Sequence, residues 1–132
     1  MTEYFRQIVC PKDDKYAAII EDNGRVAYAY LLHDKEIVGD VWLYNQASTP
    51  DLVDWSDPSN MPFLNPYNFL VKNKEIKPIV SDSDVTIEWS FGDEEVRIQV
   101  FIRGELFAVL EKGSLPGWST FVIKDGPLAK KR

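Results

Sequence analysis

Hydrophobic and polar residues alternate along much of this chain, and this pattern is typical of β-strands. The alternation is clearest over residues 84–91, whose apolar face consists of Val85, Ile87, Trp89 and Phe91. Because successive side chains of a strand point to opposite faces, the stretch predicts a half-buried antiparallel strand with this apolar face internal. Similar stretches predict strands at residues 4–9, 15–21, 25–33, 36–45, 95–103, 105–112 and 118–124.

Short turn sequences separate these strands. Asn23-Gly24 is the strongest hairpin signal, because both residues tolerate the positive φ that a two-residue turn requires. Arg103-Gly104 offers a similar connection between two later strands. Four strands precede a long middle segment and four follow it. The chain is therefore predicted to be all-β, with antiparallel meanders of about seven or eight strands forming a two-sheet sandwich or an open barrel.

The middle segment, residues 46–69, reads QASTPDLVDWSDPSNMPFLNPYNF and holds four of the eight prolines. Its prolines prevent it from continuing a sheet, while Trp55 and Phe63 make it too apolar for an ordinary polar loop. A loose loop of this length is unusual inside one domain, so we expect residues 45–67 to form a packed connection between the two sheets. Short helical turns are possible at residues 50–55 and 65–70.

The strand at residues 36–45 carries apolar residues on both faces. Simple alternation places Asp40, Trp42 and Tyr44 on the same face. Either the middle segment covers this face, which we favour, or the aromatic face is offered to a partner. Gly39 is expected to mark a β-bulge or a close approach of another backbone.

Composition supports one soluble domain over residues 1–132. The chain has ordinary fractions of hydrophobic (45%) and charged (27%) residues, and it shows neither a signal-peptide pattern nor a run of 18 apolar residues. A cytoplasmic location is expected. With 21 acidic and 15 basic side chains the net charge is −6, which disfavours nucleic acid and anionic membranes as partners. Residues 126–132, which end in a basic cluster, are expected to be a frayed tail.

Candidate catalytic and metal-binding residues are few. The chain has one histidine, His33, and one cysteine, Cys10, so a zinc site is excluded. His33 is expected in a solvated turn and Cys10 in the core. Several aspartates crowd the middle segment and residues 82–84, but their spacing does not match a calcium-binding loop and turn formation explains them. We therefore predict no metal, no cofactor and no enzymatic activity.

Several spaced motifs resemble a group of small uncharacterised bacterial proteins with a single domain. The motifs are EIVGDVWLYN (36–45), PFLNP (62–66), RGEL (103–106), PGWS (116–119) and DGPLA (125–129). This resemblance implies a bacterial, single-domain protein, and it carries over no activity and no site residues.

The first functional hypothesis is a non-enzymatic domain that binds a basic protein partner. Its sharpest form is a bacterial immunity or antitoxin-like protein that neutralises a toxic enzyme. Aromatic anchors supply most of the buried energy of such interfaces, and complementary charge speeds association. The predicted partner-binding residues are Trp55 and Phe63 as anchors, Asp54 and Asp57 as a polar rim, and Trp42 and Tyr44 if the aromatic face is exposed.

Two alternatives stay open. In the first, the protein binds a small ligand such as a sugar or metabolite, with residues 46–69 as a lid and Trp42, Tyr44 and Trp55 lining the pocket. In the second, the middle segment only completes the core, and the function lies on another surface.

Overall fold

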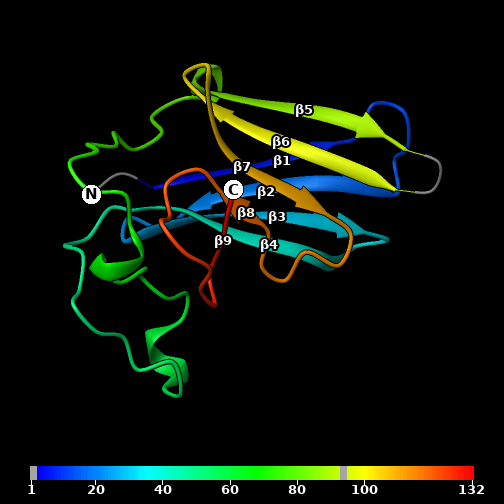
Figure 1. The fold of residues 1–132 in the computed structure, drawn as a ribbon. Helices are drawn as coiled ribbons and strands as arrows, with labels where there is room; N and C mark the ends of the chain where they lie inside the picture. The colour runs from blue at the N-terminus through cyan, green and yellow to red at the C-terminus, as the bar shows by residue number, and fades with distance from the viewer. Residues whose placement is uncertain (1–2, 93–94) are drawn as a thin grey trace.

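The structure, a computed structural model, describes residues 3–92 and 95–132 and confirms the all-β prediction. The first sheet is antiparallel and runs in chain order: β1 (Tyr4–Val9), β2 (Tyr16–Asp22), β3 (Val26–His33) and β4 (Glu36–Asn45). The second sheet also runs in chain order: β5 (Val85–Phe91), β6 (Val96–Ile102), β7 (Glu105–Glu111), β8 (Trp118–Ser119) and β9 (Lys130–Lys131). The strands form two stacked layers, an open sandwich rather than a closed barrel (Figure 1).

Both predicted hairpin turns are present. Gly24 has a φ of 88° between β2 and β3, and Arg103 and Gly104 have φ values of 50° and 78° between β6 and β7. A further two-residue turn at Asp34-Lys35 also has positive φ at both positions. Two-residue turns such as the last two match the twist of the strands that they join. Between β2 and β3 the connection has three residues, 23–25, of which only Gly24 has positive φ.

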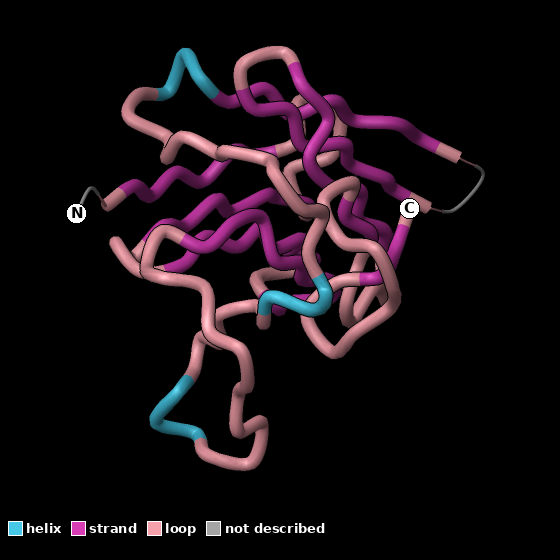
Figure 2. Tube along the Cα trace, turned by 60° about the vertical axis from the view of Figure 1, so that its left-hand side comes forward, coloured by secondary structure: helices cyan, strands magenta, loops and turns pink. Residues whose placement is uncertain are grey.

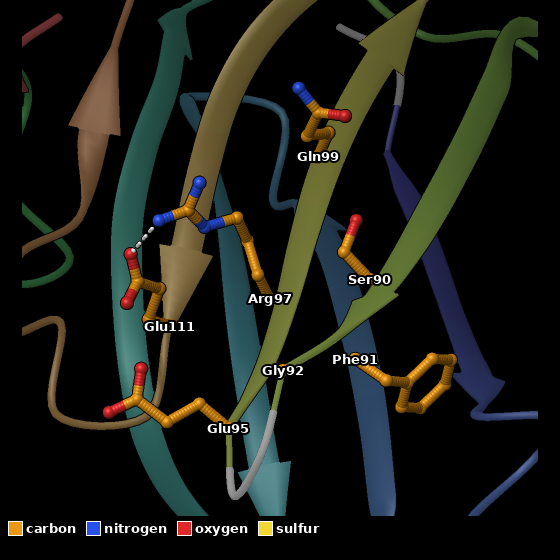
Figure 3. A pocket seen from close by; sticks show the side chains of 7 residues that line it. All are labelled: Ser90, Phe91, Gly92, Glu95, Arg97, Gln99 and Glu111. Atoms are coloured by element: carbon orange, nitrogen blue, oxygen red, sulfur yellow. Dashed lines mark hydrogen bonds and ion pairs between the residues drawn. The ribbon is translucent and has the colours of Figure 1, made fainter.

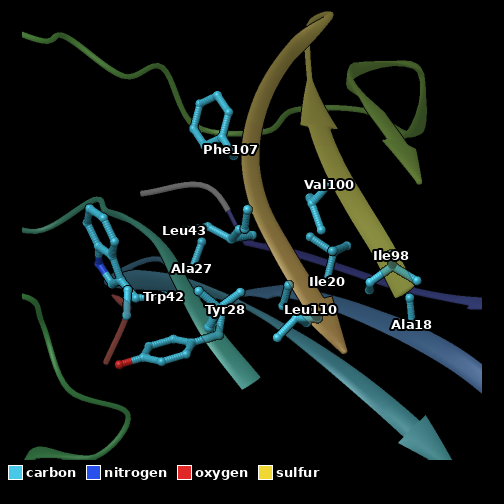
Figure 4. Close-up of a cluster of buried hydrophobic side chains, with 14 of the residues drawn as sticks. Ala18, Ile20, Ala27, Tyr28, Trp42, Leu43, Ile98, Val100, Phe107 and Leu110 are labelled. Carbon is cyan, nitrogen blue, oxygen red and sulfur yellow. The ribbon is translucent and has the colours of Figure 1, made fainter. Parts of the chain in front are cut away.

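The core lies between the inner faces of the two sheets (Figure 4). Ile20 of the first sheet is fully buried with Ile98 and Leu110 of the second. Each such side chain contributes roughly 1.5–3 kcal/mol by leaving water, so the apolar alternation drives the pairing of the layers. The prediction of an internal Phe91 is wrong, because this residue ends β5 at the rim of the sheet and is exposed beneath the Lys12 ammonium group.

β4 is the edge strand of the first sheet, and its outer edge forms backbone hydrogen bonds with segments of the second half of the chain. The Asp40 amide donates to the Ser114 carbonyl oxygen over 2.9 Å, and the Gly117 amide donates to the Asp40 carbonyl oxygen over 2.7 Å. Farther along, the Trp42 amide donates to the Leu128 carbonyl oxygen over 3.0 Å. These bonds join the two layers along one side and hold the β4 backbone in place.

Gly39 marks both a bulge and a close approach, as the sequence indicated. Leu31 pairs with Gly39 and Leu32 with Ile37, so Val38 is an extra residue in β4. A Cβ atom on Gly39 would lie 3.0 Å from the Glu111 carbonyl oxygen. Glycine therefore allows this close contact between the sheets without displacing the neighbouring backbone.

The predicted strand at residues 118–124 is shorter than expected. Only Trp118 and Ser119 belong to β8, after which the chain turns so that Phe121 and Val122 are buried. Val122 instead forms an isolated bridge with Leu70, which directly follows the middle segment. Tertiary packing thus overrides the local alternation.

The prediction of a frayed tail at residues 126–132 is wrong. Leu128 and Ala129 are buried, and β9 pairs in parallel with β8. The Lys130 amide also donates to the Gly117 carbonyl oxygen over 2.8 Å. Two apolar side chains with a place in the core outweigh the tendency of a basic terminus to fray.

The connection from β4 to β5 contains three short 3-10 helices: η1 (Pro58–Asn60), η2 (Tyr67–Phe69) and η3 (Asp82–Asp84). The helical turn expected at residues 65–70 is present as η2, whereas residues 50–55 form no helix. The part that contains η1 extends away from the sheets as a loop (Figures 1 and 2). Within residues 3–92 and 95–132, no helix has the length and apolar character needed to cross a membrane.

Candidate functional site

The outer face of the first sheet is apolar although it points away from the core. Strand register aligns its residues in three rows: Phe5, Glu21, Tyr28 and Trp42; Gln7, Ile19, Tyr30 and Asp40; Val9, Ala17, Leu32 and Ile37. Phe5, Val9 and Ile37 have exposed fractions of 60%, 51% and 54%. An antiparallel sheet usually turns polar residues to solvent, so a sheet face of this kind is typical of a contact surface.

A second bulge in β4 separates two residues that the sequence placed together. Tyr28 pairs with Trp42, but its neighbour Ala27 pairs with Tyr44, so Leu43 is an extra residue. The alternation is reset at this point. Trp42 therefore lies on the outer face with Tyr28, and Tyr44 lies on the inner face with Ala27.

Trp42 and Tyr44 are both buried, with exposed fractions of 1% and 0%. Trp42 borders a small hollow whose other side includes Thr49 of the middle segment and Ile76 farther along the connection to β5, and its Nε1 donates to Asn45 Oδ1 over 2.9 Å. The connection from β4 to β5, of which the middle segment is the first part, therefore covers this strand, which is the alternative that we favoured. The assignment of Trp42 and Tyr44 as partner contacts is wrong, and these two residues cannot line one pocket together.

The Asn45 side chain, at the end of β4, forms hydrogen bonds with the backbone of Asn65 near the end of the middle segment. Its Oδ1 accepts a hydrogen bond from the Asn65 amide over 2.9 Å, and its Nδ2 donates to the Asn65 carbonyl oxygen over 2.8 Å. This paired bond to a buried backbone replaces the ladder bonds that another strand would provide.

Two residues of β3 and its turn hold the projecting loop, residues 51–63, against the sheet. Arg25 Nη2 donates to the carbonyl oxygens of Asn60, over 2.8 Å, and Pro62. The Tyr28 hydroxyl donates to the Phe63 carbonyl oxygen over 2.7 Å. The loop is thus an ordered extension of the outer face, because its carbonyl groups are bound by side chains of the sheet.

The predicted anchors meet within loop 51–63. The rings of Trp55 and Phe63 form an edge-to-face pair with centroids 5.2 Å apart at 79°. Phe63 is half-buried against the core, whereas Trp55 has an exposed fraction of 38%. Trp55 therefore offers apolar surface from a fixed position, which limits the entropy lost when a partner binds.

The predicted rim aspartates organise the turns of this loop. Asp54 Oδ1 accepts hydrogen bonds from the Ser56 hydroxyl, over 2.6 Å, and the Ser56 amide. Asp57 Oδ1 accepts equivalent bonds from Ser59 and caps η1. These bonds lower the pKa of both carboxyl groups, so both stay ionised at neutral pH.

A cavity of about 390 Å³ lies where loop 51–63 meets the outer face. Its wall includes Tyr28, Tyr30 and Asp40 from the sheet and Met61 and Phe63 from the loop. Burial raises the pKa of Tyr30 to about 12, and burial also raises the pKa of Asp40. Both hydroxyl and carboxyl groups are thus partly withdrawn from water.

Tyr28 and Tyr30 were not predicted as site residues, and Asp40, although noted as a face neighbour of Trp42, was not among the predicted partner-binding residues. The signal was present, since Tyr28 and Tyr30 are two residues apart in a strand and must share a face. Nothing in the sequence showed that this face was the outer one or that Phe63 would fold over it.

Another hollow lies on the second sheet and is polar (Figure 3). Arg97 and Glu111 point toward each other there and form an ion pair of 2.6 Å. Gln99 and Ser90 supply further polar groups, and the Phe91 ring is directed away from the ion pair (Figure 3). Because its opposite charges already satisfy each other, this hollow is a weaker candidate.

The remaining candidate chemistry has structural explanations. Cys10 is buried, as expected. The His33 ring stacks on Tyr16 with centroids 4.4 Å apart, and its Nε2 lies 3.6 Å from Asp34 Oδ2. In the described part of the chain, no three His, Cys, Asp or Glu side chains are placed to hold a metal ion.

Comparison of the chain with protein-family models, with curated proteins and with solved structures finds no match. The resemblance to small bacterial proteins therefore stays a prediction. The features that bear on function are the outer face of the first sheet and loop 51–63.

Proposed function

We propose that this chain is a protein-binding domain whose contact surface is the outer face of the first sheet together with loop 51–63. One observation carries the proposal: exposed apolar residues of the sheet and of the loop adjoin each other. Ile37 and Met61, both exposed, line the same cavity although 24 positions separate them in sequence. An apolar surface built from two segments and held by hydrogen bonds is typical of an interaction site.

The partner that fits this surface best is a basic protein. The chain has a net charge of −6, and Glu21 and Asp40 place carboxylates among the apolar residues of the outer face. Complementary charge speeds the encounter and rejects acidic competitors, while Trp55 and Phe63 supply an aromatic anchor. Replacement of Trp55 by alanine should therefore weaken binding by about 2 kcal/mol or more.

The narrowest form of this proposal is an immunity or antitoxin-like protein that neutralises a basic toxic enzyme. The acidic charge and the preformed contact surface support it. The alternative is a small ligand, such as a sugar or metabolite, in the cavity beneath loop 51–63. Its support is the aromatic lining of Tyr28, Tyr30 and Phe63, and loop 51–63 would take the place of the predicted lid.

The test is affinity capture from the native lysate with three forms of the full chain. Ile37→Asp places a charge in the proposed surface, and Ile123→Asp places the same charge at a similarly exposed site outside it. Urea unfolding of all three forms verifies that each variant is folded.

The proposal expects one basic protein to be captured by the wild type and by Ile123→Asp and to be lost with Ile37→Asp. Equal capture by both variants would place the partner elsewhere on the molecule. An empty capture with the wild type, combined with a change of tryptophan fluorescence on adding a sugar or metabolite, would favour the small-ligand alternative.

A further inference from the structure

The cavity between Tyr30 and loop 51–63 contains a carboxylate that the protein itself does not neutralise. Asp40 is half-buried, and within residues 3–92 and 95–132 its side chain makes no hydrogen bond or ion pair. Arg25, which acts electrostatically on Tyr28, donates instead to the carbonyl oxygens of Asn60 and Pro62. A partly desolvated carboxylate without a partner is costly, so its position calls for an explanation.

Backbone hydrogen bonds fix the position from which this carboxylate extends. The Asp40 amide and carbonyl groups are bonded to Ser114 and Gly117, at 2.9 and 2.7 Å. The register opposite Tyr30 turns the Asp40 side chain to the outer face. Because the backbone is already fixed, only side-chain freedom is lost when this carboxylate binds a cation, and this limits the entropic cost.

Aromatic rings complete the wall of the cavity. Tyr28 and Tyr30 lie with ring centroids 6.1 Å apart and planes within 16° of parallel. The bond from the Tyr28 hydroxyl to the Phe63 carbonyl oxygen fixes one ring and the loop that faces it. The faces of aromatic rings attract cations, most strongly where water is excluded.

We propose that this cavity receives the guanidinium group of an arginine presented by the basic protein partner. The inference rests on the proposed function and specifies its central contact. Arginine fits better than lysine because its planar guanidinium can pair with a carboxylate through two hydrogen bonds while lying flat on a tyrosine ring. The volume of about 390 Å³ falls in the range of small-ligand pockets, which is ample for one side chain.

The experiment uses the full chain and three probes: Nα-acetyl-arginine amide, Nα-acetyl-lysine amide and Nα-acetyl-citrulline amide. Citrulline has nearly the shape of arginine but no charge, so it separates ion pairing from apolar contact. Amide shifts of residues 28, 30 and 40 are followed by NMR during each titration. Asp40→Asn removes the carboxylate charge, and Glu88→Gln, an exposed site on the second sheet, is the matched control.

The expected result is saturable binding of the arginine probe with a Kd on the order of 10 mM or tighter. The citrulline probe and the Asp40→Asn variant should each bind about tenfold more weakly, and Glu88→Gln should behave like the wild type. Equal binding of arginine and citrulline, unchanged binding by Asp40→Asn, or no shifts at residues 28, 30 and 40 would overturn the proposal.

Failure here is distinguishable from failure of the proposed function. If the arginine probe does not bind but Ile37→Asp still abolishes capture of a basic protein, the proposed contact surface is supported and the proposed arginine contact is rejected. If the arginine probe binds and the lysate capture is empty, the cavity recognises guanidinium groups while the protein partner remains unsupported.

Discussion

The Tyr44 hydroxyl donates a buried hydrogen bond of 2.6 Å to the Asp22 carboxylate, and this bond links the end of β4 to the end of β2. Asp22 also accepts bonds from the Gly24 amide and the Gln46 side chain. In addition, the Ile79 amide donates to the Tyr44 hydroxyl over 2.9 Å. The Tyr44 hydroxyl thus bonds to both a carboxylate and an amide and brings three separate parts of the chain together. Tyr44 faces inward to do so because of the bulge at Leu43.

Tyr44→Phe should destabilise the protein by about 2–3 kcal/mol, since it leaves both Asp22 and the Ile79 amide short of a partner in a buried site. Urea unfolding measures the change. Tyr30→Phe is the matched control, because the Tyr30 hydroxyl makes no hydrogen bond within residues 3–92 and 95–132 and should cost less than about 0.5 kcal/mol. Equal losses in the two variants would contradict the role assigned to Tyr44.

Gly117→Ala should be destabilising by roughly 1–3 kcal/mol through overpacking. The new methyl group would lie 2.6 Å from the Val109 carbonyl oxygen and 2.5 Å from Leu110 Cδ2. Gly92→Ala serves as the control, since its methyl group would meet only the Glu95 carbonyl oxygen at 3.8 Å. Thermal unfolding of both variants should show a lower Tm for Gly117→Ala alone, and a stable Gly117→Ala protein would argue against this close packing.

Leu128→Ala should destabilise the protein by about 2 kcal/mol or more, because it empties a buried site near the chain terminus. Leu115→Ala, at an exposed leucine, should change stability by less than about 0.5 kcal/mol. Chemical denaturation compares the two variants. A neutral Leu128→Ala would mean that the tail is frayed after all.

Asp40→Asn should raise stability at pH 7 while it removes the proposed arginine contact. Burial raises the pKa of Asp40 in the folded protein, so folding disfavours the charged form. Well below the unfolded pKa of 3.8 both states are protonated and the penalty is absent. The penalty grows as pH rises from 3.8, where only the unfolded state ionises, and it is complete above the higher pKa of the folded state. The gain should be below about 1 kcal/mol, because the side chain is half-exposed and water screens it.

The measurement is the difference in Tm between Asp40→Asn and the wild type at pH 7 and at about pH 2.5. The difference should be positive at pH 7 and vanish at about pH 2.5. A difference that persists at the lower pH would show that the substitution acts through packing rather than through charge. Glu88→Gln, at an exposed carboxylate, should give no comparable gain at either pH.

Much of the fold could be predicted from local sequence. Seven of the eight predicted strands are present nearly in full. The alternation of apolar and polar residues indicates which side chains lie on each face of a strand, and glycine-containing turns indicate where the chain reverses direction. The middle segment was expected to be packed, but only part of it is: Phe63 is half-buried against the core, whereas loop 51–63 projects from the sheets and leaves Trp55 38% exposed. The candidate site was predictable only in part: Trp55 and Phe63 do meet, but Trp42 and Tyr44 are buried.

The sequence by itself determined the strands, their hairpin turns and the acidic charge, because each depends on neighbouring residues or on composition. Only the tertiary structure decided that Tyr28, Tyr30 and Asp40 line one cavity with Phe63. The reason is physical: the bulges at Val38 and Leu43 reset the alternation of β4. A bulge depends on how two strands are paired and not on either strand alone, so alternation along one strand cannot report it.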